Sequence, residues 1–158
     1  MNRARAAKRV GVLFESVLQT FTGTRPSTIP MPPIAEPAAC ELCAPADILL
    51  ESEHAYVRYD NNTLSRGHVL VVPRRHVASF FDMTSAEQAD ILGLLTQAQS
   101  LIQAKHSPDG YNIGVNVGKA AGQSRMHVHV HLIPRYAGDV ADPSGGIRCV
   151  LSSKTSRS

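Results

Sequence analysis

The feature that most constrains this sequence is a run near residue 130 in which histidine and valine alternate. His127, His129 and His131 are separated by Val128 and Val130. Successive side chains of a strand point to opposite faces of a sheet, so the three imidazoles should share one face while the valines enter the core. A half-buried strand that happens to carry histidines would satisfy the alternation alone. Three of the chain's seven histidines at this spacing, between a Gly-Gln-Ser loop and Pro-Arg, favour a functional site.

The same spacing limits what the three histidines can bind. A strand rises about 3.3 Å per residue, so the outer two Cα atoms lie roughly 13 Å apart. A metal ion with bonds near 2 Å cannot take all three imidazoles, although two neighbours can share one. The three side chains are therefore expected to have different roles.

The pattern of apolar residues predicts a fold with one helix and several strands. Thr84 and Glu87 form a capping box that begins the helix, and the SPDG segment at 107–110 ends it. The apolar stripe of this helix consists of Ile91, Leu94, Leu95, Ala98, Leu101 and Ile102. Strands are expected at 47–51, 55–59, 68–72, 111–117 and 126–133. One long helix between groups of strands indicates an α+β fold with an antiparallel sheet of about five strands.

The chain divides into three segments by composition. Residues 1–38 hold a basic amphipathic helix and a proline-rich linker, residues 39–151 form the globular domain, and residues 152–158 are expected to be a disordered tail. The N-terminal helix can dock on the domain or a partner or remain disordered, or residues 1–21 can contact a membrane surface or target an organelle. A secretory signal is disfavoured because no clear small-residue cleavage site follows. No apolar run reaches the length of a membrane span.

Charge argues against one class of partner. The net charge of +3 equals the excess of basic residues in 1–38, where five basic side chains face two acidic ones. The rest of the chain has 11 of each sign and is neutral. Because duplex nucleic acid is normally bound by a clustered basic excess, none is expected as a partner.

Three blocks of the sequence carry a family resemblance. GHVLVVPRRH at 67–76, NVGKAAGQS at 116–124 and HVHVHLIPR at 127–135 resemble, in order and spacing, the signature blocks of the histidine triad nucleotide-binding superfamily. The IPRYAGDVADPSGGIR segment is most similar to the diadenosine polyphosphate hydrolase branch, which is called fragile histidine triad-like. The resemblance implies a HIT-like fold, a nucleotide or dinucleotide substrate and a homodimer in which two sheets join.

The resemblance also implies roles for individual residues. His129 is the expected nucleophile on the α-phosphorus, which suits a neutral imidazole near pH 7. His131 and Gln123 complete the catalytic group. The expected nucleotide-binding residues are Asp60 for the ribose hydroxyls, His68 for ordering the triad, and Asn116, Gly122, Gln123 and Ser124 for the phosphates. For Asp60 and His68, an exposed turn residue and a structural histidine remain the alternatives.

A second constellation is the pair of cysteines in Cys40-Glu41-Leu42-Cys43. A C-x-x-C pair can place two thiolates on one ion, and the sequence has no second such pair. In zinc-containing members of the superfamily, the positions that match His76 and His127 complete the site, which implies a structural zinc. A redox dithiol and two unrelated thiols are the alternatives. The third cysteine makes the count odd, which favours a reducing compartment such as the cytoplasm, with an organelle as the alternative.

Three classes of function are consistent with these residues. The first is hydrolysis of dinucleoside polyphosphates through a nucleotidyl-histidine intermediate. The second is hydrolysis of nucleoside phosphoramidates, or a phosphorylase reaction in which phosphate replaces water. The third is a non-catalytic nucleotide-binding or scaffold protein, which the complete triad disfavours because a pure binder needs no free nucleophile.

Overall fold

The computed structural model describes residues 40–150 and shows an antiparallel sheet with one long helix. The predicted N-terminal helix, the linker and the tail at 152–158 lie outside the described residues. The strands are β1 (Ile48–Glu51), β2 (Ala55–Tyr59), β3 (Val69–Pro73), β4 (Gly110–Val115) and β5 (Val130–Arg135). They lie in the order β1-β2-β3-β5-β4, and every neighbouring pair is antiparallel. The predicted α+β class and the five-stranded sheet are confirmed.

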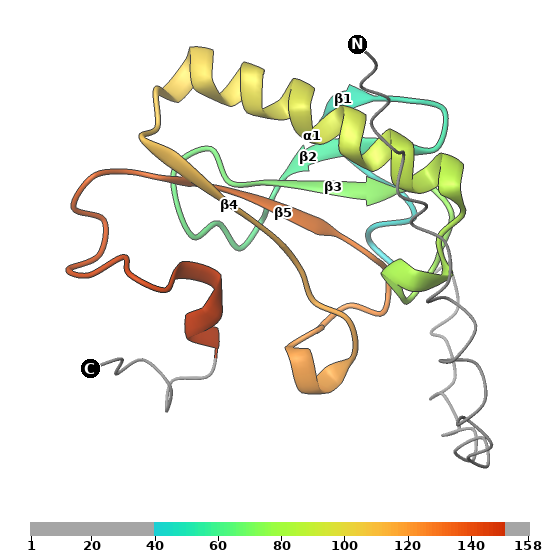
Figure 1. The fold of residues 1–158 in the computed structure, drawn as a ribbon. Coiled ribbons are helices and arrows are strands. Elements are labelled where there is room, and N and C mark those ends of the chain that lie inside the picture. The colour runs from blue at the N-terminus through green and yellow to red at the C-terminus, as the bar shows by residue number, and fades with distance from the viewer. Residues whose placement is uncertain (1–39, 151–158) are drawn as a thin grey trace, which may run out of the picture. The chain divides into compact units, whose positions relative to one another are not determined.

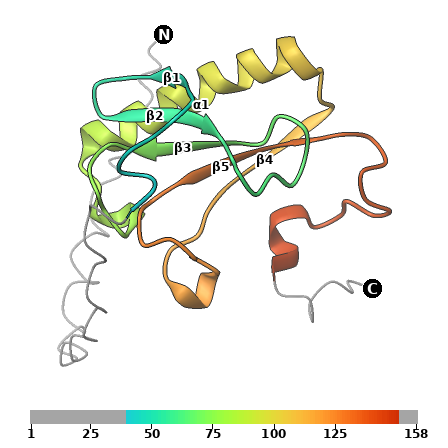
Figure 2. The ribbon, with the colours of Figure 1, turned by 180° about the vertical axis from the view of Figure 1, so that it is seen from behind.

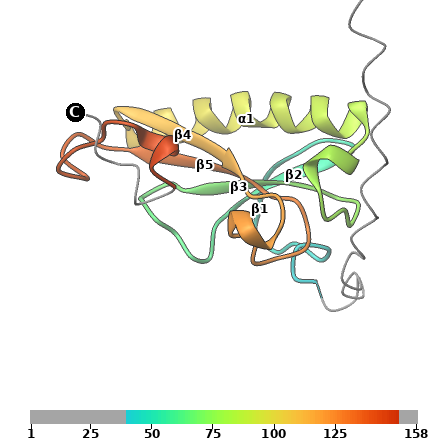
Figure 3. The ribbon, with the colours of Figure 1, turned by 60° about the horizontal axis from the view of Figure 1, so that its bottom comes forward.

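The helix α1 (Ser85–His106) covers one face of the sheet (Figures 1 and 3). It begins at the predicted capping box, in which the Thr84 side chain accepts from Glu87 N–H and the Glu87 carboxylate accepts from Thr84 N–H. Arg75 adds two hydrogen bonds of 2.8 Å to the same carboxylate. These bonds hold the pKa of the buried Glu87 carboxyl at about 2. The bonds from Arg75 also join the start of the helix to the loop after β3.

The apolar core lies between α1 and the sheet. It contains the predicted helix stripe, except that Leu101 is 38% exposed and points away from the core. In a helix of 3.6 residues per turn, position 101 falls at the margin of the stripe defined by Ile91, Leu94 and Ala98, and Ile102 takes the buried place. Between residues 40 and 150, three short 3-10 helices lie in the loops: η2 (Phe80–Asp82), η3 (Lys119–Ala121) and η4 (Gly146–Val150).

A smaller apolar cluster on the other face of the sheet holds the first described segment in place. Leu42 packs against Tyr56, Leu70 and Val72, and the Tyr56 hydroxyl donates to the Leu42 carbonyl at 2.7 Å. Burial is the main cause that raises the pKa of Tyr56 to about 12, so the hydroxyl stays a donor at neutral pH. The view from behind shows this blue segment near β3 (Figure 2). Packing around Leu42 thus brings the C-x-x-C turn to the face that carries the histidines.

Within residues 40–150, no helix is both long and apolar enough to cross a membrane.

Candidate functional site

The three histidines keep the predicted alternation but do not all lie on a strand. β5 begins at Val130, four residues later than the predicted start at 126. The reason is that Val128 N–H donates to the Val77 carbonyl at 2.8 Å, in the loop after β3, and takes no place in the sheet ladder. Val128 and Val130 are nevertheless buried in the core under α1. The histidines therefore face away from α1, as the alternation predicts.

His129 has one ring nitrogen tied to the backbone. Its Nδ1 lies 2.8 Å from the carbonyl oxygen of His127, and an oxygen can only accept, so Nδ1 carries the proton. In the neutral imidazole Nε2 then holds a lone pair. The His129 side chain is 8% exposed and lines a cavity of about 500 Å³. Its geometry suits a nucleophile that attacks through Nε2.

His131 is oriented by a chain of hydrogen bonds that starts at the backbone. Leu64 N–H donates to Nδ1 of His68 at 3.2 Å, so His68 carries its proton on Nε2. That Nε2 lies 3.0 Å from Nδ1 of His131 and donates to it. His131 is therefore the tautomer with its proton on Nε2, the opposite of His129. The Nε2 proton of His131 and the Nε2 lone pair of His129 thus lie on two neighbouring rings, whose centroids are 5.1 Å apart.

Burial keeps His68 and His131 neutral. Burial first, and then the neighbouring His129 and His68, lower the pKa of His131 to about 4, while Asp60 opposes them. Burial also lowers the pKa of His68, again against the carboxylate of Asp60. At pH 7 both rings are neutral, as their hydrogen-bond chain requires.

The predicted sugar-binding residue lies beside these rings. Oδ2 of Asp60 is 3.5 Å from Nδ1 of His68 and 3.8 Å from Nδ1 of His131, and Oδ1 accepts from Asn62 N–H. Nδ1 of each ring already accepts a hydrogen bond, so the Asp60 carboxylate bonds to neither ring and acts on the pair through its charge. Asp60 lines the same cavity as His129, which makes it more than an exposed turn residue.

The predicted phosphate loop divides into lining and supporting residues. Asn116 and Ser124 line the cavity with His129, and Gly122 lines the neighbouring cavity, with a φ of +83° that favours glycine. Gln123 is 5% exposed and does not line either cavity. Its Oε1 accepts from Gly118 N–H and its Nε2 donates to the Ala78 carbonyl, both at 2.7 Å. The amide therefore holds the loop to the segment after β3, where the sequence had suggested a donor to phosphate.

The cavity also contains residues that the sequence analysis did not single out. Arg125 lines it and forms an ion pair of 3.0 Å with Glu41, and Leu70 and Leu42 provide apolar wall. Asn61 lies at the same wall and accepts from Arg58 at 2.8 Å. Arg125 follows Ser124 directly, so its place next to the phosphate loop was the available signal. Asn61 likewise follows Asp60 directly. Leu42 and Leu70 come from separate segments, which the apolar cluster with Tyr56 and Val72 brings together.

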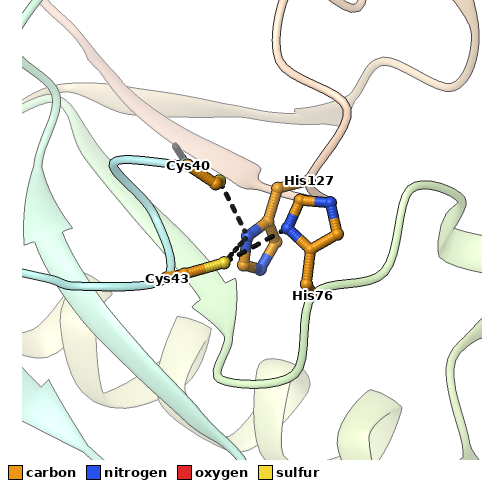
Figure 4. A group of neighbouring side chains, drawn as sticks. All are labelled: Cys40, Cys43, His76 and His127. Atoms are coloured by element: carbon orange, nitrogen blue, oxygen red, sulfur yellow. Dashed lines mark hydrogen bonds between the residues drawn. The ribbon is translucent and has the colours of Figure 1, made fainter. Parts of the chain in front are cut away.

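The two cysteines and two histidines predicted to hold a metal converge in one cluster (Figure 4). Sγ of Cys43 lies 3.2 Å from Nδ1 of His76 and 3.5 Å from Nδ1 of His127, and Sγ of Cys40 lies 3.4 Å from the latter. In a tetrahedral zinc site, sulfur and nitrogen ligands are ~3.5 Å apart. The four residues can therefore hold a metal ion.

Three further observations describe the surroundings of this cluster. Nε2 of His127 lies 2.8 Å from the Pro73 carbonyl and donates to it, which leaves Nδ1 with a lone pair toward the thiols. Burial and the neighbouring Cys40 raise the pKa of the Cys43 thiol, so two thiolates need a cation between them. Nε2 of His76 is buried without a hydrogen-bond partner among the described residues. The four residues thus provide two sulfur and two nitrogen ligands. Among them, His127 lies closest in sequence to His129.

Comparison with known proteins places the chain in a family. The HIT domain model matches residues 41–138, which is more than half of the chain. This protein belongs to the HIT domain family, as the three sequence blocks indicated. The match covers all five strands, α1, the metal cluster except Cys40, and all three histidines of the triad.

Relatives of known sequence support the assignment. The chain is 40% identical over 95 residues to an uncharacterised HIT-like protein of Methanocaldococcus jannaschii, covering 60% of this chain and 73% of that one. It is 40% identical over 74 residues to AP-4-A phosphorylase of Mycobacterium tuberculosis, and 41% over 76 residues to the asymmetrical bis(5'-nucleosyl)-tetraphosphatase of Schizosaccharomyces pombe. These matches cover 46% and 48% of this chain. The chain spans only 22% to 42% of the length of three of the curated relatives it matches.

Solved structures agree with the fold. A HIT family protein of Bacillus anthracis superposes with a TM-score of 0.60 at 31% identity, covering 64% of this chain and 76% of that one. A zinc-bound histidine triad family protein of Mycobacterium smegmatis gives the same TM-score at 31% identity, with 67% and 81% covered.

The lowered pKa of His131 predicts a pH-dependent stability. In the unfolded chain the imidazole binds a proton below pH 6.5, whereas in the fold it does so only near pH 4. The unfolded state therefore gains protons first as the pH falls, and stability that is complete above pH 6.5 is lost progressively toward pH 4. From pH 7 to pH 5 this group should account for about 2 kcal/mol.

Urea unfolding at the two pH values measures this loss. The His131→Asn protein, which keeps an acceptor for His68, should lose about 2 kcal/mol less than the unmodified protein between pH 7 and pH 5. His54→Asn replaces a half-buried histidine away from the triad and serves as the control, which should lose as much stability as the unmodified protein. Equal losses in the His131→Asn and unmodified proteins would contradict the prediction.

Proposed function

We propose that this protein is a nucleotide hydrolase that cleaves dinucleoside polyphosphates such as diadenosine tetraphosphate at the α-phosphate. The observation that carries the proposal is the hydrogen bond from His129 to the His127 carbonyl, which leaves the Nε2 lone pair as a nucleophile beside a cavity. The names of two relatives support the substrate class, since one is an AP-4-A phosphorylase and the other a tetraphosphatase.

In the first step, Nε2 of His129 attacks the α-phosphorus. A phosphorus–nitrogen bond forms and the bond to the bridging oxygen breaks, so the leaving phosphate takes the electron pair. His131, with its proton on Nε2, is placed to donate to the phosphate oxygens or the departing oxygen. The His127 carbonyl stabilises the positive charge on the His129 ring through the Nδ1 proton. The product is a nucleotidyl-histidine and a shortened nucleotide.

In the second step, water attacks the same phosphorus atom. The phosphorus–nitrogen bond breaks, the electron pair returns to Nε2 of His129, and the water proton leaves to solvent or to the site. The nucleoside monophosphate is released, and one difficult displacement has become two easier ones.

The remaining residues bind and position the substrate. Asp60 accepts from the ribose hydroxyls, and Asn116 and Ser124 donate to the phosphates from the wall of the cavity. Gly122 leaves room for close backbone approach. Gln123 acts as a positioning residue, since its amide holds the loop. His68 sets the tautomer of His131.

Replacement of the nucleophile is the direct test. His129→Asn should lower kcat by on the order of a thousandfold or more, because no other group can form the covalent intermediate. The unmodified protein is incubated with a slow substrate, and the reaction is quenched by denaturation at alkaline pH, where the phosphorus–nitrogen bond persists. The peptide that contains His129 should then carry one added nucleotide. His106→Asn, on the last turn of α1, is the control. An active His129→Asn protein, or an adduct elsewhere, would overturn the assignment, and no turnover by any variant would favour a non-catalytic nucleotide-binding or scaffold protein.

A second candidate uses the same intermediate with another acceptor or leaving group. Phosphate in place of water would release a nucleoside diphosphate, and the likeness to a phosphorylase favours this variant. An amine leaving group would make the protein a nucleoside phosphoramidate hydrolase, which needs the same nucleophile.

Product analysis separates these activities. With diadenosine tetraphosphate in phosphate-free buffer, the hydrolase should release AMP and ATP, because water is the acceptor. Addition of phosphate should leave these products unchanged, whereas a phosphorylase would release ADP only with phosphate present. Adenosine phosphoramidate, assayed in parallel, should be turned over more slowly; a clear preference for it would favour the phosphoramidate hydrolase.

We also propose that the cluster of Cys40, Cys43, His76 and His127 holds a structural zinc. The ligand separations and the hydrogen bond from His127 to the Pro73 carbonyl support this assignment, as does the zinc-bound relative among the solved structures. When bound, the ion supplies a crosslink that joins the 40–43 turn to the segment carrying the nucleophile. The chain's own residues carry out the chemistry.

Metal analysis tests the zinc site. Protein purified without added zinc should contain about one equivalent per chain, and Cys43→Ser should reduce it to a few tenths or less, because removal of one thiolate weakens the site. A chelator should lower the Tm of the unmodified protein but not that of Cys43→Ser. His54→Asn is the control that retains the metal. Less than a few tenths of an equivalent in the unmodified protein would contradict the site.

Two broader proposals follow from the family and from composition. A homodimer through β4 is supported by the position of this strand at the edge of the sheet and by Ile113, which is 51% exposed. A cytoplasmic location is supported by the odd count of three cysteines, which does not suit a disulfide framework, with targeting to an organelle through residues 1–21 as the alternative.

A further inference from the structure

We propose that Arg125 and its partner Glu41 select substrates by the length of the phosphate chain. The guanidinium of Arg125 leaves the Glu41 carboxylate and binds phosphates beyond the α-phosphate. The three sequence blocks and the C-x-x-C pair give neither side chain a role. The proposal rests on the proposed function, because the cavity beside His129 must hold the phosphate chain, and it adds a specificity-determining residue to that site.

The charges in the cavity with His129 make a long phosphate chain depend on one side chain. Glu41 and Asp60 place two carboxylates in its wall, and Arg125 is the only lysine or arginine among the described residues that lines it. His131 adds no charge at pH 7, because burial is the main cause that lowers its pKa to about 4. Each further phosphate brings negative charge, which the two carboxylates repel. The guanidinium of Arg125 is the group that offsets this repulsion.

Two ordered segments bring the pair to the cavity. Arg125 directly follows Ser124, which lines the same wall. The backbone around Arg125 is fixed on both sides, by the two hydrogen bonds of the Gln123 amide and by the bond from Val128 N–H to the loop after β3. Glu41 lies in the C-x-x-C turn, whose buried leucine packs on the sheet. Both charges are therefore held beside the space that the phosphates enter.

The contact between the two side chains is an ion pair that a ligand can open. Nη2 of Arg125 lies 3.0 Å from Oε1 of Glu41, and the two side chains are 59% and 49% exposed. By contrast, Arg75 donates through two nitrogens to both oxygens of Glu87, whose side chain is 7% exposed. A single contact between exposed charges is weak, whereas phosphate oxygens can accept several guanidinium hydrogen bonds. A phosphate chain can thus replace the carboxylate as the partner of Arg125.

This arrangement predicts opposite effects for the two members of the pair. Loss of the guanidinium removes the donor for the phosphate chain and leaves the carboxylates uncompensated. Loss of the Glu41 charge removes a competitor for Arg125 and a source of repulsion. An ion pair with a purely structural role would give effects of the same sign, because either replacement breaks the same contact.

Steady-state kinetics of the full chain test these signs. Arg125→Gln should lower the ratio of kcat/KM for diadenosine tetraphosphate to kcat/KM for adenosine phosphoramidate by roughly tenfold, and Glu41→Gln should raise it by about twofold. Arg74→Gln is the matched control, because it removes a guanidinium from an exposed ion pair with Glu51 outside this cavity, and the ratio should stay the same. An unchanged ratio in Arg125→Gln, or a fall of the ratio in both variants of the pair, would overturn the proposal.

Equilibrium binding separates this proposal from the proposed function. In the His129→Asn protein, Arg125→Gln should weaken binding of ATP by roughly tenfold and binding of AMP by less than about twofold, because these ligands differ only in the phosphates beyond the α-phosphate. Added salt should reduce the preference for ATP more steeply when Arg125 is present. This pattern would support the role of Arg125 even if the unmodified protein turned over neither substrate, a result that would refute the catalytic proposal alone. Equal weakening for both nucleotides, or none, would refute the role of Arg125.

Discussion

The hydrogen bond from Nδ1 of His129 to the carbonyl of His127 joins the two functional groups of this protein. It fixes the lone pair of His129 on Nε2, and it connects the candidate nucleophile to a residue of the metal cluster. His127 is itself held from two sides, by the Pro73 carbonyl and by the thiols of Cys40 and Cys43. A displacement of this residue therefore changes the position of the His129 ring.

In each histidine of the triad, a hydrogen bond to one ring nitrogen fixes which nitrogen carries the proton. Backbone groups determine the tautomers of His127, His129 and, through His68, His131, so neighbouring rings present a lone pair and a donor. Burial supports this arrangement because it lowers the pKa of His131 to about 4 and keeps the ring neutral. A site that needs neutral imidazoles at pH 7 thus pays for them with stability in acid.

Much of the fold and part of the site were predictable from local patterns. The capping box at Thr84, the alternation at His127 to His131 and the C-x-x-C turn each depend on residues close in sequence, and each is found in the structure. The predicted start of the last strand at 126 was wrong, because the Val77 carbonyl takes the hydrogen bond of Val128. Leu101 was assigned to the core by a periodicity that does not resolve the margin of a helix stripe.

The sequence by itself determined which chemistry is present: alternating histidines on one face, two thiols at metal-binding spacing, and a glycine-rich loop before them. The tertiary structure decided how these groups are used. Gln123 turned inward to the Ala78 carbonyl, Arg125 entered the cavity, and Ile147 of η4 packed close to Gly114. These outcomes depend on contacts between segments far apart in the chain. Local sequence patterns indicate on which face of a helix or strand a side chain lies, but only tertiary packing determines which residues lie opposite it.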